Sequence, residues 1–359
     1  MCRWFAYISP TEPCLLEDVL VEPKHSLARQ VHEHYLPRLL AHDHTITEEQ
    51  DMHARNMLYN IDGLGIAWYT SARSDFERGN TGEGSDGSKR EGLRPAMYKT
   101  VQPPMNDSNF RSICANTETR VLFGHIRAAS STTITAVNNH PFIFGRHSFM
   151  HNGVLSDFTP IRRAMSSKMS DAAYANVFGS TDSEHLAALY ITYLTDSADD
   201  DSFENAYPLE KMVASMHKAV ATSISLQRSM IGDRKRRPNS LNLCATDGVK
   251  LVAFRFRNHA TSQPPSLYYS TKAGTTLNRK HPDHPDGHYI AGVTDAIEKP
   301  ERRHGAHLIV ASEPSTYKAE DWELIGKNQC ITADADGRYE IRDVPHEKEW
   351  DAEDHVRWE

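Results

Sequence analysis

Two adjacent amphipathic segments in the middle of the chain constrain its fold most. Residues 181–194 and 209–230 both place apolar side chains along one face at helical spacing. Thr181 followed by Glu184 predicts a capping box at the start of the first segment. Since an apolar helix face has to be buried, we expect both helices to pack side by side against a sheet.

Strand-like segments lie on both sides of this helical pair. Asp247-Gly248 between two of them is a strong hairpin signal. Strands, two adjacent helices and strands again predict an α+β fold, and they suit a four-layer αββα sandwich. The expected strands are residues 2–9, 66–69, 121–126, 142–144, 148–150, 241–245, 249–256, 267–269 and 308–311.

The length of 359 residues allows one large domain or two ordinary ones. We predict a single domain over residues 2–345. Residues 78–95 are expected to form a flexible insertion, because residues 78–92 are rich in Gly, Ser, Asn and charged side chains with almost nothing apolar. Residues 346–359 are expected to form a loose, charged tail.

Composition and charge narrow the class of protein. The formal net charge of −8 gives no electrostatic case for nucleic-acid binding. No segment approaches the ~20 apolar residues of a membrane span. Pro10, Glu12 and Pro13 interrupt the only early apolar run, so we expect no signal peptide. Five cysteines without regular spacing argue against a disulfide framework and favour reduced thiols in the cytoplasm.

Two histidine-rich stretches invite a metal interpretation. They are residues 32–34 and residues 281–288, and the second is punctuated by two prolines and a glycine, as in a mobile loop. The chemistry suggested below requires no metal and no other cofactor. We therefore predict neither.

Cys2 follows the initiator methionine directly. Methionine aminopeptidase removes Met1 when the second residue is small, so the mature chain would begin with Cys2. The α-amine has a reference pKa of about 7.7–8.0 and the thiol one of about 8.5, so the amine can accept the thiol proton near neutrality. An N-terminal amine that activates its own nucleophile is a known solution to acyl transfer. By itself, however, a cysteine at this position says little.

Four sequence blocks follow Cys2 in order, and a weaker one closes the set. Together with Cys2 they resemble the class II glutamine amidotransferases, which are N-terminal-nucleophile hydrolases that cleave a γ-glutamyl amide. The resemblance also implies the four-layer sandwich of that type. The blocks are residues 123–130 (FGHIRAAS), 139–142 (NHPF), 149–153 (FMHNG) and 179–184 (GSTDSE), with the weaker echo at 310–314 (VASEP).

The resemblance implies a role for three residues in bond cleavage. Cys2 would supply the nucleophile and, through its amine, the base. The side-chain amide of Asn152 and the backbone N–H of Gly153 would converge on the oxyanion. Alone, His-Asn-Gly would be interpreted as a plain turn, since Asn-Gly is a common hairpin dipeptide.

Further residues are implied in holding the glutamyl end of the substrate. Arg127 would grip its carboxylate, helped by the Ser130 hydroxyl, and Asp182 would pair with its ammonium. An acidic residue in the first turn of a helix is also favoured by the helix dipole, so Asp182 fits both interpretations. Asp62 and His140 are expected to support the pocket and not to transfer protons.

The likeness also suggests a substrate and a partner. About 165 residues follow Leu194, and they are needed to complete the sandwich, so we expect no synthase domain. Within the family, the blocks favour the fungal subunit that opens the γ-glutamyl bond of glutathione with a peptidase-like partner. Three alternatives stay open: a glutaminase that supplies ammonia to a separate synthase, a hydrolase of another γ-glutamyl conjugate as in ergothioneine biosynthesis, and a non-catalytic partner protein.

Overall fold

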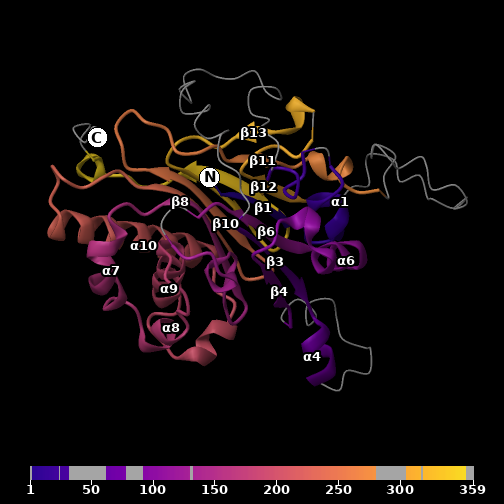
Figure 1. The fold of residues 1–359 in the computed structure, drawn as a ribbon, viewed down its shortest axis with the longest axis horizontal. Coiled ribbons are helices and arrows are strands. Elements are labelled where there is room, and N and C mark those ends of the chain that lie inside the picture. The colour runs from indigo at the N-terminus through magenta and orange to yellow at the C-terminus, as the bar shows by residue number, and fades with distance from the viewer. Residues whose placement is uncertain are drawn as a thin grey trace, which may run out of the picture.

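The computed structural model consists of two antiparallel sheets stacked face to face, with helices on both outer faces (Figure 1). This α+β arrangement confirms the predicted four-layer αββα sandwich. The residues that the structure describes are 2–23, 25–31, 62–77, 92–129, 132–279, 305–316 and 318–352.

The first sheet carries the N-terminal strand in its middle. Its seven strands, in spatial order, are β13 (Glu323–Leu324), β11 (Tyr268–Ser270), β12 (Leu308–Ala311), β1 (Arg3–Ile8), β6 (Val121–Arg127), β3 (Gly63–Thr70) and β4 (Arg94–Thr100). Strand β1 is antiparallel to both neighbours, with Arg3 opposite Ile126 and Phe5 opposite Ala311. The start of β1 therefore lies beside the ends of β6 and β12.

The second sheet contains the predicted hairpin. Its strands are β15 (Tyr339–Asp343), β14 (Gln329–Ala333), β10 (Leu251–Arg257), β9 (Ser240–Thr246), β8 (His147–Val154) and β7 (Phe142–Phe144). The turn between β9 and β10 is confirmed at Asp247-Gly248, where the Asp247 carboxylate accepts the N–H groups of Val249 and Lys250. A short third sheet pairs β2 (Cys14–Leu15) with β5 (Glu118–Thr119).

Strand β8 is longer than the sequence indicates. We expected Asn152 and Gly153 to follow the strand, but they lie within it, opposite Asn242 and Leu241 of β9. The register with β9 extends β8 to Val154.

Two groups of helices cover the outer faces of the sandwich (Figure 1). Both predicted long helices are confirmed, and Thr181 caps the first by accepting the N–H of Glu184. The Glu184 carboxylate accepts the N–H groups of Phe178 and Gly179. The helices on the second sheet are α7 (Phe158–Ser166), α8 (Asp171–Ala175), α9 (Asp182–Leu194) and α10 (Leu209–Met230); α1 (Leu16–Leu20) and α6 (Ser108–Asn116) lie on the first, and α4 (Ala72–Glu77) follows β3.

Apolar side chains fill the space between the two sheets. Trp4 and Phe123 of the first sheet pack in one cluster with Met150, Leu251 and Ile331 of the second. All five are almost completely buried. This burial holds the two sheets face to face. Because apolar contact is non-directional, it does not by itself determine how the polar side chains at the strand ends of one sheet lie relative to those of the other.

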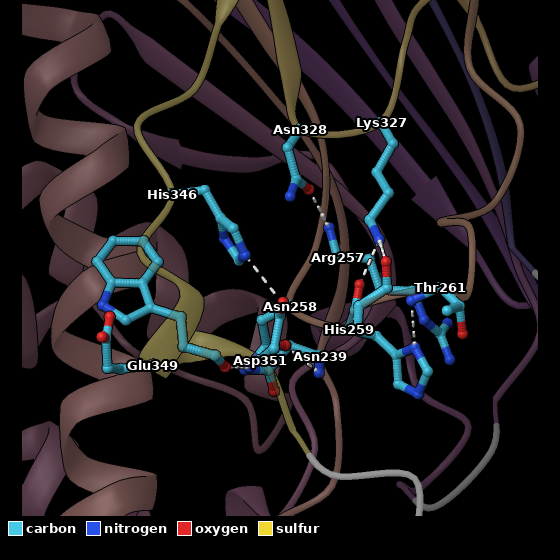
Figure 2. A network of polar contacts seen from close by, with 12 residues as sticks. Asn239, Arg257, Asn258, His259, Thr261, Lys327, Asn328, His346, Glu349 and Asp351 are labelled. Carbon is cyan, nitrogen blue, oxygen red and sulfur yellow. Dashed lines mark hydrogen bonds and ion pairs between the residues drawn. The ribbon is translucent and has the colours of Figure 1, made fainter.

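The C-terminal segment differs from the expected loose tail. Trp350 is buried, and the buried Arg236 guanidinium donates to the carbonyl oxygens of Glu349, Trp350 and Asp351. Asn258 also donates to the Trp350 carbonyl oxygen at 2.8 Å. The His346 ring lies 2.9 Å from a carboxylate oxygen of Asp351 in the same segment (Figure 2). The loose-tail prediction is therefore wrong for residues 346–352, while residues 353–359 lie outside the described part of the chain.

The proposed insertion is described only at its end. Residues 78–91 lie outside the described residues, and the chain re-enters at Gly92 and forms β4 from Arg94 onward. No helix among the described residues is long and apolar enough to cross a membrane.

Candidate active site

The ends of several elements meet at one end of the sandwich, and the predicted site residues lie at these ends. Cys2 precedes β1 and Asp62 precedes β3, while Arg127 ends β6. Asn152 and Gly153 lie near the end of β8, and Asp182 begins α9. Antiparallel pairing explains the arrangement within the first sheet, since strands that run in opposite directions place one start beside each end.

The Cys2 thiol lies against the chain that leaves β6. Its Sγ atom accepts a hydrogen bond from the Ala128 N–H, with an N–S distance of 3.3 Å. Burial raises the pKa of the Cys2 thiol above its usual value, although the Ala128 N–H and the charges of Arg127 and Arg3 act in the opposite direction. A thiol of raised pKa is mostly protonated near neutrality, so it needs a nearby base to act as a nucleophile.

Arg127 is almost fully buried beside the nucleophile candidate. Its guanidinium donates to the hydroxyl of Thr132 and to the carbonyl oxygen of Thr133, the latter at 3.2 Å. Burial lowers the pKa of Arg127, and the negative charges of Asp62 and Asp182, with that of a Cys2 thiolate, act against this effect. The guanidinium remains charged near neutrality, because an arginine starts from a pKa above 12.

Asp62 joins β3 to the segment after β6. Its carboxylate accepts the Ala129 N–H at 2.7 Å, and its own N–H donates to the Arg127 carbonyl oxygen at 3.2 Å. These two bonds fix the backbone on both sides of Ala128, whose N–H contacts Cys2. Ser130, the other residue predicted on this segment, lies outside the described residues.

Asn152 and Gly153 have well-defined local geometry. The Asn152 side-chain nitrogen donates to the Ser312 hydroxyl at 3.3 Å, and the side chain is buried. Gly153 has a φ of +148°, and a Cβ atom there would lie 1.8 Å from the Ser240 carbonyl oxygen. Only glycine fits this backbone conformation and close approach.

Asp182 ties the start of α9 to the chain that leaves β8. One carboxylate oxygen accepts the Leu155 N–H at 2.8 Å, and the other accepts the N–H and hydroxyl of Ser183 at 2.8 and 3.2 Å. These contacts satisfy the ordinary role of an acidic residue at a helix start. The oxygen that contacts Leu155 keeps a second lone pair for another donor.

His140 lies in a buried pair of imidazoles. Its ring centroid is 4.0 Å from that of His125, and the peptide bond to Pro141 is cis. Burial lowers the pKa of His125 to about 3 and that of His140 well below its usual value. Both rings are therefore neutral near pH 7 and sit in the packed interior.

A buried charge cluster beside Cys2 was not predicted from the sequence. The Glu313 carboxylate pairs with the Arg3 guanidinium and, at 2.9 Å, with Nε2 of His25. Arg3 also donates to the Cys2 carbonyl oxygen at 3.1 Å. Burial alone would raise the pKa of Glu313, but Arg3 and His25 lower it to about 2.

This cluster leads to a stability prediction for Glu313→Gln. We expect the variant to lose about 3 kcal/mol of unfolding free energy at pH 7, because it removes the negative charge that pairs with the buried Arg3 guanidinium. The folded pKa of Glu313 is about 2, below its ordinary value of 4.5. Its stabilisation is therefore complete above about pH 4.5 and is lost as the pH falls toward 2.

Denaturant unfolding at pH 7 and pH 3 measures this effect. The difference in unfolding free energy between the wild type and Glu313→Gln should shrink at the lower pH. Glu347→Gln is the matched control, since Glu347 is exposed. A difference that is the same at both pH values would contradict the role of the Glu313 charge.

The described residues hold no group of three or more His, Cys, Asp or Glu side chains arranged to bind a metal ion. The two histidine-rich stretches singled out in the sequence, residues 32–34 and 281–288, lie outside the described part of the chain.

Comparison with known proteins shows which family the chain resembles. The sequence profile of the class II glutamine amidotransferases matches residues 50–224. The probable glutamine amidotransferase DUG3 of Saccharomyces cerevisiae is 27% identical over 342 residues, which cover 92% of this chain and 81% of the yeast protein. The chain is thus similar to the class II glutamine amidotransferases, over residues 50–224 by the profile and over most of its length by the yeast relative.

The fold of this chain is shared with a solved structure. A glutamine aminotransferase class-II domain protein from Silicibacter pomeroyi matches with a TM-score of 0.56 and 20% identity. The match covers 96% of this chain and 98% of the bacterial one. The agreement in fold thus extends over nearly the whole length of both chains.

The site residues that the sequence did not predict have one property in common: their partners are distant in the sequence. Arg3 and Glu313 are 310 positions apart in the sequence and meet only because β1 pairs with β12. The sequence held one signal, since Arg3 directly follows Cys2 and Glu313 lies in the weaker block of the family resemblance. Such a resemblance marks residues without saying what they contact.

Proposed function

We propose that this protein is a class II glutamine amidotransferase that hydrolyses γ-glutamyl amides with Cys2 as its nucleophile. The observation that carries the proposal is the Cys2 thiol, which accepts the N–H of Ala128, the residue after the buried Arg127, and whose pKa the Arg127 charge lowers. A nucleophile next to a fixed cation suits a substrate whose reacting amide and free carboxylate belong to the same small molecule.

The chemistry proceeds in two steps. The α-amine of Cys2, free once Met1 is removed, takes the thiol proton, and the thiolate attacks the γ-carbonyl carbon. Asn152 and the Gly153 N–H donate to the resulting oxyanion. The protonated amine then gives its proton to the leaving nitrogen, and a thioester remains on Cys2. Water hydrolyses this thioester and releases glutamate.

Recognition of the glutamyl end rests on two charges. Arg127 binds the α-carboxylate, with its guanidinium held in place by Thr132 and Thr133. Asp182 binds the α-ammonium through the carboxylate oxygen that also contacts Leu155. Ser130 completes the carboxylate site, while Asp62 and His140 hold the surrounding chain.

Glutathione is the substrate that we propose, because its γ-linked glutamate offers the same carboxylate and ammonium as glutamine. In this proposal the chain works with a peptidase-like partner in trans, which receives the departing Cys-Gly dipeptide. A cytoplasmic location fits the five cysteines, all of which are free thiols in the structure. The name of the yeast relative favours glutamine, which makes glutamine hydrolysis the second candidate.

A panel of substrates tests the function and separates the candidates. Glutamate release is measured with glutamine, glutathione and other γ-glutamyl amides, for the isolated chain and with proteins that co-purify from cell extract. We expect turnover of glutathione, and a larger rise on glutathione than on glutamine when the partner is added. Turnover of glutamine alone would favour the glutaminase, and release from no substrate would refute the proposal.

Substitution of the two recognition residues provides a prediction. Asp182→Asn should lower kcat/KM for glutamine and glutathione alike by about 30-fold or more, since losing one partner of a buried charge pair commonly costs about 2–5 kcal/mol. Arg127→Lys keeps the charge and loses the planar fork, so KM should rise about tenfold. Steady-state kinetics on both substrates measures the two effects.

A substrate analogue separates ammonium binding from the helix-start role of Asp182. Glutaramate carries the same amide and carboxylate as glutamine but has no α-amine. If Asp182 pairs with the ammonium, Asp182→Asn should impair glutamine hydrolysis far more than glutaramate hydrolysis. An equal loss on both would reduce Asp182 to a helix-capping residue.

A further inference from the structure

The two residues that follow β12 contact both halves of the proposed site. Ser312 and Glu313 come directly after Ala311, the last residue of the strand, and both are buried. β12 pairs with β1, so these residues lie beside the start of β1, where Cys2 is attached. Neither residue was assigned a role from the sequence.

Ser312 forms a polar link between the two sheets. Its hydroxyl oxygen accepts the Trp4 N–H at 3.0 Å and the Asn152 side-chain amide at 3.3 Å. Trp4 belongs to the first sheet and Asn152 to the second. The backbone of Ser312 is fixed as well, because its N–H donates to the Trp4 carbonyl oxygen at 2.9 Å and its own carbonyl accepts the Ser266 hydroxyl at 2.9 Å.

Glu313 holds the start of β1, next to Cys2. Its carboxylate pairs with Arg3, and Arg3 donates to the carbonyl oxygen of Cys2 at 3.1 Å. Two consecutive side chains therefore hold the Asn152 amide and the backbone of Cys2. Because Ser312 and Glu313 are adjacent in the sequence, the position of the Asn152 amide and that of the Cys2 backbone both depend on the same short segment.

We propose that Ser312 is a positioning residue that sets the orientation of the Asn152 amide relative to Cys2. The inference rests on the proposed function, in which Asn152 donates to the oxyanion. One N–H of the amide is directed to Ser312, which leaves the second N–H for the substrate oxygen. Without Ser312, the amide can rotate about its terminal torsion, which has a broad energy profile.

Such a loss should act on the transition state more than on substrate binding. The oxyanion forms only during the reaction, so a misdirected donor lowers kcat while the glutamyl end is still held. Displacing a reacting group by about 1 Å can cost about 100-fold in rate. We therefore expect Ser312→Ala to lower kcat about 30-fold and to change KM less than about threefold. Ser312→Thr, which keeps the hydroxyl, should recover part of the loss.

A double-mutant cycle with Asn152→Ala tests the proposal. If Ser312 acts through the Asn152 amide, Ser312→Ala should reduce kcat further by less than about twofold in the Asn152→Ala background. Ser223→Ala is the matched control, since it removes a buried helix hydroxyl that bonds to Ala219 in α10. Thermal unfolding of each variant identifies any general loss of folded protein.

The outcomes separate the inference from the proposed function. An unchanged kcat in Ser312→Ala, or the same fold loss with and without the Asn152 amide, would overturn the positioning role alone. Wild-type protein that releases no glutamate from any γ-glutamyl amide would overturn both. A kcat loss that disappears in the Asn152→Ala background supports the proposal.

Discussion

Replacing Cys2 with alanine should abolish glutamate release, with a loss of at least about 10⁴-fold in kcat. The variant keeps the α-amine but has no group to form the thioester, and removal of a nucleophile commonly leaves only residual rate enhancement from binding. Since the thiol is half-buried and bonds to the backbone of Ala128, which other contacts also hold, the fold should persist. Steady-state kinetics and thermal unfolding of the purified variant measure the two properties.

Removal of Met1 provides an independent test of the role of Cys2, because the mechanism needs its α-amine to be free. Intact-mass measurement of the active wild-type protein should show that Met1 is absent, so that the Cys2 amine is free to act as the base. A short peptide fused ahead of Cys2 should abolish turnover, whereas the same peptide fused after residue 359 should not. Cys14→Ala is the matched thiol control, because Cys14 is buried and belongs to the short third sheet. Full activity with Met1 retained would contradict the mechanism.

Local signals explain which parts of the fold could be predicted. Helices α9 and α10 were placed from the spacing of their apolar residues and, for α9, from the capping threonine, and these features act within one or two turns. The hairpin between β9 and β10 was predicted by Asp247-Gly248, and Gly248 has a φ of +88°. The four-layer arrangement then followed from the order of these elements and from the family resemblance.

Long-range contacts explain where the prediction was wrong. The end of β8 is set by its pairing with β9, in which Val154 lies opposite Ser240, and the two strands are distant in the sequence although they are adjacent in space. The charge of residues 346–352 indicated a tail, but Trp350 is buried and its carbonyl oxygen accepts from Arg236, 114 positions away. The composition of residues 346–352 does not show which other part of the chain they pack against.

For the candidate site, too, local sequence motifs supported a prediction and long-range contacts did not. The ordered blocks predict that Cys2, Arg127, Asn152 and Asp182 belong to one site, and this stays a prediction; Cys2 precedes β1, Arg127 ends β6, Asn152 lies near the end of β8 and Asp182 begins α9. The contacts that orient these groups were not predictable. They involve Thr132, Thr133, Ser312 and Glu313, whose partners are identified only once the chain is folded.

Replacing Asn152 with alanine is expected to have the second largest effect. Loss of one preorganised oxyanion donor typically costs about 2.7–4 kcal/mol of transition-state stabilisation, which corresponds to a kcat about 10²–10³ times lower. KM for glutamine should change little, because the glutamyl end is held by Arg127 and Asp182. The buried side chain contacts Ser312, so some loss of stability is expected as well, and thermal unfolding measures it separately.

Asn242 offers a matched control for this prediction. It is a buried asparagine directly opposite Asn152 in the register of β8 and β9, but its amide donates to the carbonyl oxygens of Pro265 and Ser266 at 3.1 Å. Asn242→Ala should therefore lower the unfolding free energy while kcat stays within about threefold of wild type. If the two variants lost stability equally and Asn152→Ala kept kcat within about tenfold of wild type, Asn152 would be a packing residue, and the oxyanion would need a different donor.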